Sequence, residues 1–210
     1  MTLEEYLDHL LAGEDEACLA EARGRAVDLD GLHRLYVDVI QPSQYRVGEL
    51  WEGGKISVAT EHLATATNSY VASMSYAPLA RATTGGPRAL IACTPDEMHE
   101  LGPRMLADLL EGDGWDVDFY GTSMPVRDLI GAIRERKPLF VGLSAALVMH
   151  LGSVKRTITA MGEALGAEKP PVVVGGNAFR GDGELWRQVG ADFYAADASA
   201  AVDVLRDLKK

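Results

Sequence analysis

Hydrophobic residues in the first 80 positions recur every three or four residues, which is the spacing of one face of a helix. The repeat is clear at Leu3, Tyr6, Leu7 and Leu10. Glycines at 53 and 54 interrupt it, and Ser57 is a suitable N-cap for a new helix. The pattern predicts four helices, over 2–12, 14–24, 28–51 (bent near Pro42) and 57–79.

The pattern changes after residue 88 to short runs rich in β-branched and aromatic residues, separated by segments of helix length. The runs are RALIACT, WDVDFYG, LFVGLSA, PVVVGGN and ADFYAAD. This alternation predicts five parallel strands in a doubly wound α/β sheet, of the flavodoxin-like or Rossmann-like kind. The stretch RATTGGPR at 81–88 has the glycine pair and proline of a linker. We therefore expect a four-helix bundle at 1–80 and an α/β domain at 89–210.

Composition narrows the range of functions. The 210 residues carry a formal charge of −11 with a pI near 4.9, which argues against direct nucleic-acid binding. The two cysteines, Cys18 and Cys93, lie far apart and suggest neither a disulfide framework nor a CxxC metal site. The N-terminus is acidic where a signal peptide is basic, and no apolar run approaches membrane-spanning length. We expect a cytoplasmic protein that does not engage a membrane.

The loop after the first predicted strand, TPDEMHELG, holds the most suggestive side chains. In a doubly wound sheet, ligand groups lie at the carboxyl ends of the strands. No phosphate-binding glycine motif follows this strand; the loop carries His99 instead. Glu97 could orient the imidazole as a carboxylate does behind a metal-bound histidine, and Gly102 could let a bulky ligand approach. Taken alone, the pattern also fits a general base or an ordinary loop histidine.

The rest of the sheet supplies a resemblance. The motif at 97–102 is followed by Ser144-Ala145-Ala146 and then by Gly175-Gly176. In order and spacing this resembles the DxHxxG, SxL and GG signature of cobalamin-binding proteins such as methionine synthase and the cobalamin mutases.

The resemblance implies that His99 is the lower axial ligand of cobalt, in place of the cofactor's own dimethylbenzimidazole base. It further implies that the displaced nucleotide tail runs past Ser144, Gly175 and Gly176. Two residues depart from the signature: Glu97 replaces the usual Asp, and Ala146 replaces the Leu of SxL. Glutamate still reaches the imidazole, and alanine leaves more space beside the tail.

A second resemblance lies in the helical region. Trp51 is followed, after nine residues, by Glu61-His62. This is similar to the WxxxxxxxxxEH signature of the cobalamin photoreceptors related to the carotenoid-gene repressors. It implies that Trp51, Glu61 and His62 surround the upper adenosyl group of adenosylcobalamin. It also implies that light breaks the cobalt–carbon bond and thereby signals, so the chain would be a sensor rather than an enzyme.

The chain differs from those repressors in two ways. It begins with the helical cap instead of a DNA-binding module, so we expect its output to pass through an unknown downstream protein or a change of homo-oligomeric state. Glu52 stands where the repressors carry the histidine that ligates cobalt after illumination. His150 follows the third strand, where we expect it on the tail side; His9 and His33 fit ordinary helix surfaces.

The last predicted helix of the cap is rich in small and hydroxyl-bearing residues from 64 to 77. Close helix packing explains this composition, and so does a cavity beside the cobalamin. The second explanation resembles the photocobilins, which hold a bilin, so biliverdin is a candidate second chromophore. Two other functions remain open: a corrinoid methyl carrier of a methyltransferase system and a cobalamin-binding subunit of a mutase.

Overall fold

The computed structural model describes residues 1–80, 85–181 and 183–208, with side chains up to residue 205. The chain divides into two compact units, Met1–Arg81 and Ala82–Lys210. The first half of the expected linker, 81–84, lies outside the described residues, and the first strand begins at Arg88. The two units are described separately below.

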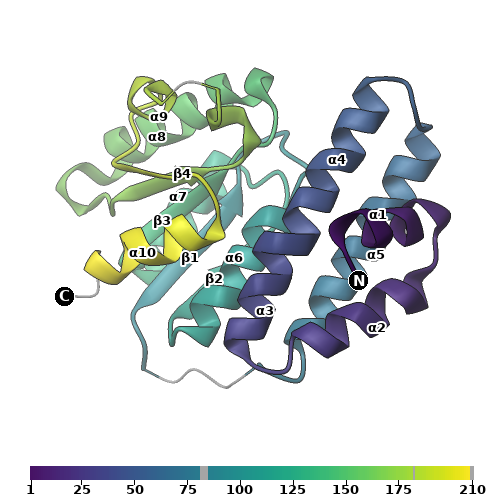
Figure 1. The fold of residues 1–210 in the computed structure, drawn as a ribbon. Helices are drawn as coiled ribbons and strands as arrows, with labels where there is room; N and C mark the ends of the chain where they lie inside the picture. Colours follow the sequence, from purple (N-terminus) through teal and green to yellow (C-terminus); the bar gives the residue numbers. More distant parts are fainter. Residues whose placement is uncertain (81–84, 182, 209–210) are drawn as a thin grey trace. The chain divides into compact units, whose positions relative to one another are not determined.

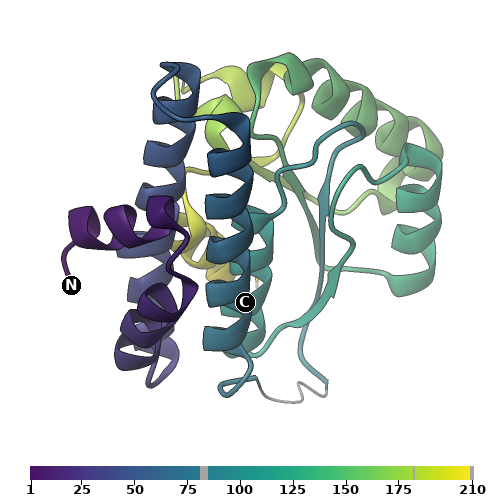
Figure 2. The ribbon, with the colours of Figure 1, turned by 90° about the vertical axis from the view of Figure 1, so that its right-hand side faces the viewer.

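The first unit is helical (Figures 1 and 2). Two long antiparallel helical stretches lie side by side, and two shorter helices pack against them. Thr2 caps the first helix with a reciprocal pair of hydrogen bonds to Glu5, and Ser57 caps the last by accepting from the Thr60 N–H group. The elements are α1 (Leu3–Ala12), α2 (Asp15–Arg25), α3 (Leu29–Leu35), the π-helical turn η1 (Tyr36–Ile40), α4 (Gln41–Glu52) and α5 (Val58–Tyr76).

The predicted bend near Pro42 is a π-helical turn. Helices α3 and α4 are continuous through η1, and the Gln41 N–H group donates five residues back to the Tyr36 carbonyl. Pro42 has no N–H group and its ring would collide with the carbonyl four residues earlier in a regular helix. The wider turn directly before Pro42 absorbs both effects without ending the helix.

Polar side chains cross the interior of this unit. The buried Tyr6 hydroxyl donates to Asn68 Oδ1 at 2.9 Å. The Asn68 amide group in turn donates to Gln44 Oε1 at 3.0 Å and to Ser43 Oγ at 3.3 Å. These contacts join α1, α4 and α5, and because each member has a partner the burial is tolerated.

Close packing accounts for the small residues of α5. Ala64 and Ala72 are buried. The hydroxyls of Ser69, Ser73 and Ser75 each donate to the carbonyl four residues earlier in the same helix. Such bonds satisfy a hydroxyl without a second helix or a ligand, so the composition of α5 does not by itself require a cavity.

The second unit confirms the predicted α/β class. Its five parallel strands have the order β2-β1-β3-β4-β5. The strands are β1 (Arg88–Cys93), β2 (Asp116–Phe119), β3 (Phe140–Ser144), β4 (Val172–Gly175) and β5 (Phe193–Ala195). The helices are α6 (Leu101–Gly112), α7 (Val126–Arg136), η2 (Val148–His150), α8 (Leu151–Leu165), η3 (Gly166–Glu168), η4 (Asn177–Phe179), α9 (Leu185–Gln188) and α10 (Ala198–Leu208).

Side chains of each strand alternate between two cores. Leu90 and Val141 face α7 and α8, whereas Ile91 and Phe140 face α6 and α10. On the second side Trp115 packs edge-on against Phe140, with ring centroids 5.1 Å apart. A sheet covered on both faces explains why the inner strands β1, β3 and β4 are almost wholly apolar after Arg88, and it leaves the strand ends as the place for polar chemistry.

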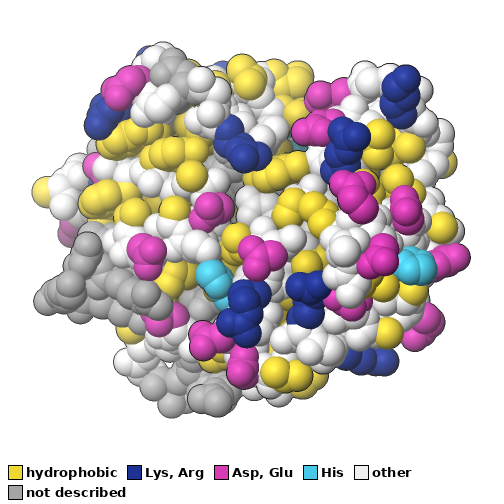
Figure 3. All heavy atoms as spheres, viewed as in Figure 1, with side chains coloured by type: hydrophobic (Ala, Val, Ile, Leu, Met, Phe, Trp, Pro, Cys, Tyr) yellow, Lys and Arg dark blue, Asp and Glu magenta, His cyan; other side chains and the backbone are white. Residues whose placement is uncertain are grey.

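Two features bear on the predictions that the protein engages neither a membrane nor nucleic acid. Within residues 1–80, 85–181 and 183–208, no helix combines the length and the hydropathy needed to cross a membrane. On the face shown in Figure 3, basic side chains stand among acidic ones. The overall charge of −11 is therefore not offset by a concentrated basic patch on that face.

Candidate functional site

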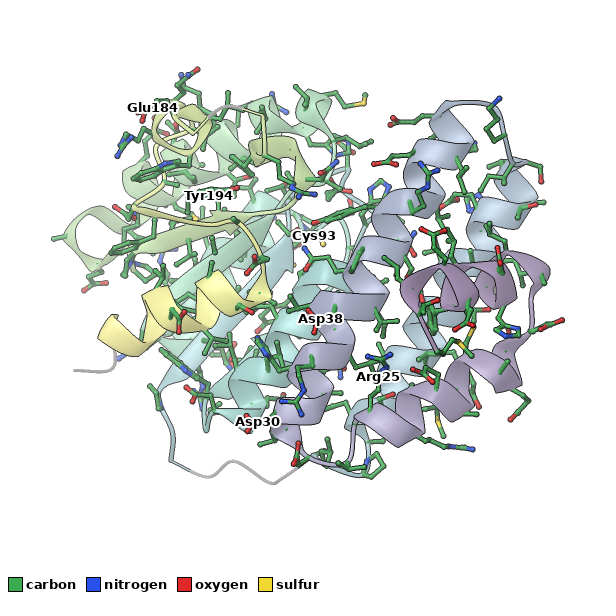
Figure 4. The ribbon with its side chains drawn as sticks, viewed as in Figure 1. Arg25, Asp30, Asp38, Cys93, Glu184 and Tyr194 are labelled. Carbon is green, nitrogen blue, oxygen red and sulfur yellow. The ribbon has the colours of Figure 1, made fainter. Side chains whose placement is uncertain are left out.

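The candidate site lies at the carboxyl edge of the sheet, where β1 and β3 are neighbours. The chain leaves β1 for β2 on one side and β3 for β4 on the other, so the strand order reverses between them. Such a switch point opens a crevice between the outgoing loops. Cys93 ends β1 (labelled in Figure 4) and pairs with Ser144, which ends β3. The loops after these two residues carry the predicted ligand groups.

Glu97 is the centre of the arrangement. Its side chain is 0% exposed. Oε1 accepts from the backbone N–H group of His99 at 2.9 Å and from His99 Nδ1 at 2.5 Å. Oε2 accepts from the backbone N–H group of Ala146 at 2.7 Å and from His150 Nδ1 at 2.8 Å. Both oxygens of the buried carboxylate therefore have two donors each.

These donors keep Glu97 ionised. Burial would raise the pKa of its carboxyl group, because a charge loses hydration in the interior. The hydrogen bonds from the His99 and His150 rings and from two backbone N–H groups outweigh burial, and they hold the pKa of Glu97 well below its usual range. A negative charge is thus fixed behind His99 over the physiological pH range.

The carboxylate sets the chemistry of the His99 ring. Nδ1 faces Glu97. In the neutral ring, a proton on Nδ1 that is donated to the carboxylate makes Nε2 the nitrogen that can bind a metal. The side chain is 57% exposed. A histidine held in one tautomer by a carboxylate is the usual arrangement behind a metal-ligating imidazole, so the donor set fits cobalt ligation.

The loop that carries Glu97 and His99 is held in an unusual backbone conformation. Asp96 adopts a positive φ of 71°, and its N–H group donates to Ser123 Oγ at 3.1 Å. Ser123, with φ of 46°, donates its own N–H group to the Glu97 carbonyl at 2.9 Å. Left-handed conformations at residues other than glycine are uncommon and tend to occur where function demands a fixed geometry.

The remaining signature residues of this unit lie at the same edge. Ser144 is paired with Gly175 across β3 and β4. Gly176 has φ of +106°, and a Cβ there would lie 2.2 Å from the Ala145 carbonyl oxygen. The backbone thus requires glycine at 176 irrespective of any ligand. Gly102 differs, because a Cβ there would meet nothing within 4 Å.

Apolar side chains stand exposed around this edge. They follow three different strands: Met98 comes after β1, Tyr120 after β2, and Leu147, Val148 and Met149 after β3. The hydroxyl of Thr94, directly after β1, is buried without a hydrogen-bond partner among the described residues. Clustered exposed hydrophobic residues mark binding surfaces, so this rim fits a large, partly apolar ligand over His99.

The predicted residues of the helical unit gather at one of its ends. Trp51 lies in the last turn of α4 and is 46% exposed. Glu61 and His62 lie in the first turns of α5, and the short connection from 53 to 57 joins the two helices. Glu61 accepts from the Thr65 hydroxyl at 2.8 Å and lies 3.1 Å from His62 Nδ1.

Sequence reasoning missed the part played by His150. We expected it on the tail side and predicted no contact with Glu97; it lies in η2 and contacts Glu97 directly. A signal was present: His150 is six residues beyond Ser144, and the strand before it neighbours the strand before His99. Only the strand order reveals this proximity. His9 pairs with Glu14 in the helical unit.

Comparison with known proteins shows the family of the chain. Two families, both described as B12 binding domain, match residues 87–203 and 2–72. The HTH-type transcriptional repressor CarH of Myxococcus xanthus is 35% identical over 149 residues, which is 70% of this chain and 48% of the relative. Dimethylamine corrinoid protein 3 of Methanosarcina mazei is 28% identical over 113 residues, covering 53% of this chain and 66% of the relative. The chain spans about half the length of the repressors it matches.

Solved structures agree on the fold. The monomethylamine corrinoid protein of Methanosarcina barkeri superimposes with a TM-score of 0.82 at 15% identity, over 97% of this chain and 96% of that one. A cobalamin-binding protein of Desulfitobacterium hafniense gives a TM-score of 0.55 at 20% identity, over 98% of each chain. The Glu97–His99 pair and the matches over both units lead to one conclusion: this chain belongs to the B12-binding domain family and binds cobalamin.

Proposed function

We propose that the chain is a light sensor that binds adenosylcobalamin, with His99 as the lower ligand of cobalt. The buried Glu97 carboxylate, which holds the His99 ring with Nδ1 inward, carries the assignment of the lower ligand. The choice of a sensor rests on Trp51, Glu61 and His62 at one end of the helical unit. When bound, the cofactor supplies a cobalt–carbon bond that light can break. The protein contributes the imidazole, the apolar rim around it, and a passage for the nucleotide tail beside Ser144, Gly175 and Gly176.

Residues of the helical unit favour the sensor function over a methyl-carrier function. Trp51, Glu61 and His62 combine an aromatic face, a carboxylate and an imidazole at one end of the bundle. An adenosyl group offers a flat base for stacking and ribose hydroxyls for hydrogen bonding, and these three side chains suit both. The 35% identity to a transcriptional repressor of the cobalamin-binding family is in keeping with signalling.

We propose that the signal leaves as a structural change of the helical unit, by altered homo-oligomerisation or by contact with a cytoplasmic partner. Loss of the adenosyl group would remove a ligand that favours one arrangement of the unit, so the population would shift to another. Direct DNA binding by these residues is not part of the proposal, given their charge of −11.

A methyl-carrier function is the second candidate. It is favoured by the dimethylamine corrinoid proteins, which are 22–28% identical over 53–98% of this chain. A carrier uses the same lower ligand but cycles a methyl group, so it has no need of an adenosyl pocket. Trp51, Glu61 and His62 therefore separate the two candidates.

The deciding experiment loads the protein with adenosylcobalamin or methylcobalamin in the dark and then illuminates it. Absorbance reports the state of cobalt, and size-exclusion chromatography with light scattering reports the oligomeric state. A sensor binds the adenosyl form and changes spectrum together with size or shape. Exclusive binding of the methyl form, or an adenosyl complex that light leaves unchanged in size and shape, would favour the carrier.

Variants of the helical unit sharpen the result. Trp51→Ala and His62→Ala should weaken binding of adenosylcobalamin more than that of methylcobalamin, because only the former has the large upper group. His33→Ala is the matched control on the same unit, since His33 lies in α3, at the other end of the continuous α3–η1–α4 stretch from Trp51. Equal losses for both cofactors would contradict an adenosyl pocket at these residues.

Biliverdin binding is a separate part of the proposal. Its support is the run of small residues in α5, which close packing also explains. Adding biliverdin to the cobalamin-loaded protein and recording the absorbance above the cobalamin bands tests it. A red-shifted band that co-elutes with the protein supports a second chromophore. If all of the biliverdin elutes apart from the protein, biliverdin is not bound and this part of the proposal is wrong.

A further inference from the structure

The Glu97 carboxylate binds two histidines, and only one of them belongs to the cobalamin signature. Oε1 faces His99, whereas Oε2 faces His150 at 2.8 Å. The His150 side chain is 13% exposed, so this contact is largely shielded from water. Fifty-three residues separate the two members of the second pair.

His150 also lies where it can link the two loops of the site. It ends η2 and precedes the first turn of α8. One turn later, Ser153 Oγ donates to the Pro95 carbonyl at 3.1 Å, which ties α8 to the loop after β1. The loop that presents His99 is therefore fastened to the start of α8 at two points. Only the first of these points involves the carboxylate.

A buried carboxylate needs its donors. If one donor is removed, the charge loses a hydrogen bond that water cannot readily replace, and the group turns toward whatever donor remains. For Glu97 the remaining donor on Oε2 would be the backbone N–H group of Ala146. Rotation of the carboxylate would in turn loosen its hold on the His99 ring, because both oxygens belong to one rigid plane.

We propose that His150 is a positioning residue. By donating its Nδ1–H group to Glu97 Oε2 it locks the carboxylate, so that Oε1 holds His99 in the tautomer that exposes Nε2 to cobalt. The inference rests on the proposed function in that His99 is taken as the cobalt ligand. The effect of His150 on the His99 ring, however, is a property of the protein without cofactor and can be measured there.

The test compares three variants. His150→Leu keeps the approximate size and removes the donor; His150→Asn keeps an N–H donor near the position of Nδ1. Ser153→Ala is the matched control, because it removes the other tie between α8 and the loop and leaves Glu97 untouched. If His150→Leu does not fold, His150→Ala with and without added imidazole replaces it, since imidazole can restore the donor.

The first readout is long-range ¹H–¹⁵N NMR of the protein without cobalamin, which distinguishes the tautomers of His99. The wild type, His150→Asn and Ser153→Ala should show the Nδ1–H form. His150→Leu should show a mixture of both forms. An unchanged single tautomer in His150→Leu would overturn the inference, whatever the cobalamin experiments show.

The second readout is the dissociation constant of adenosylcobalamin, measured by absorbance in the dark. His150→Leu should weaken binding by about 10- to 100-fold, the effect typical of losing a residue that supports a metal ligand. Ser153→Ala should stay close to the wild type. Equal affinities of His150→Leu and the wild type would also overturn the inference.

His99→Ala separates this inference from the proposed function. If its bound cobalamin spectrum equals that of the wild type, His99 is not the ligand and the proposed function fails at its site. If His99→Ala alters the spectrum while His150→Leu alters neither tautomer nor affinity, the proposed function stands and only the positioning by His150 is wrong.

Discussion

The Tyr6 hydroxyl donates a hydrogen bond of 2.9 Å to Asn68 Oδ1, and both residues are fully buried. This bond joins α1 to α5 in the helical unit. The Asn68 amide group in turn donates a hydrogen bond to Gln44 Oε1 in α4. The bundle is thus held by directional contacts in addition to apolar packing, and their removal should have a measurable cost.

Tyr6→Phe should lower the free energy of unfolding by about 1–2 kcal/mol, because it leaves Asn68 Oδ1 buried without that donor. Urea denaturation followed by circular dichroism measures the change. Tyr70→Phe is the control: it removes the same hydroxyl from an exposed position on α5 and should change stability by less than about 0.5 kcal/mol. Equal effects of the two substitutions would show that the Tyr6 bond contributes nothing specific.

Gly102→Ala should separate ligand binding from folding. Gly102 lies in the first turn of α6, where a Cβ meets nothing within 4 Å, so alanine should leave stability unchanged or raise it by up to about 1 kcal/mol. Cobalamin affinity should nevertheless fall if the bare backbone approaches the cofactor there. Thermal unfolding without cofactor and a cobalamin titration measure the two effects, and unchanged affinity would remove Gly102 from the site.

Gly176→Ala is the contrasting substitution. Its positive φ of +106° and the approach of a Cβ to 2.2 Å from the Ala145 carbonyl oxygen require the backbone to move. We expect a loss of about 2 kcal/mol or more in the protein without cofactor. Chemical denaturation in the absence of cobalamin checks this. If Gly176→Ala has the same free energy of unfolding as the wild type, the backbone of this turn can shift to accept a Cβ at no cost, and the prediction is wrong.

The two thiols should be unreactive in the native protein. Burial, with the Glu97 carboxylate as a second cause, raises the pKa of Cys93 to about 12. Burial, with Asp15 second, raises the pKa of Cys18 to about 11. Since the thiolate is the reacting form, both groups stay protonated at pH 8, and reactivity should rise only as the pH approaches these values.

Ellman's reagent checks the thiol prediction. At pH 8 the native protein should react slowly, whereas the urea-unfolded protein, with ordinary thiol pKa values, should react at once. Comparison of Cys18→Ala and Cys93→Ala assigns the residual rate to one thiol. Rapid reaction of either cysteine in the native state at pH 8 would contradict its burial.

Lys137→Gly should stabilise the second unit by about 1 kcal/mol. Lys137 ends α7 in the left-handed conformation, with φ of 49°, where a side chain is unfavourable and glycine is not. Lys137→Ala removes the charge but keeps the Cβ, so it should give little gain. The difference in melting temperature between the two variants isolates the backbone effect, and no difference would refute it.

Periodicity predicted the course of the chain well because each of its elements is strongly patterned. The five apolar runs became the five strands, and the helical stretches ended within a few residues of where they were expected. Pro42 marked the disturbed helix, but a bend and a π-helical turn have the same signature in sequence. Which one forms depends on packing of the neighbouring residues, and Tyr36, Val39 and Ile40 are all buried.

The sequence predicted only part of the candidate site. Glu97 and His99 are two residues apart, so local spacing suffices to pair them. His150 and the Ala146 N–H group reach Glu97 only because β1 and β3 are neighbours, and sequence spacing carries no record of strand order. The assignment of Trp51, Glu61 and His62 to the upper face of cobalamin stays a prediction.

The π-helical turn at Tyr36–Ile40 has a consequence for the far end of the same helix. A π turn contains one residue more than an α turn, and one residue corresponds to a rotation of about 100°. The residues after it, including Trp51, therefore point in a direction that a regular helix of the same length would not give them. The extra residue thus rotates the position of Trp51 around the helix axis and so determines the side of the helix on which its side chain lies.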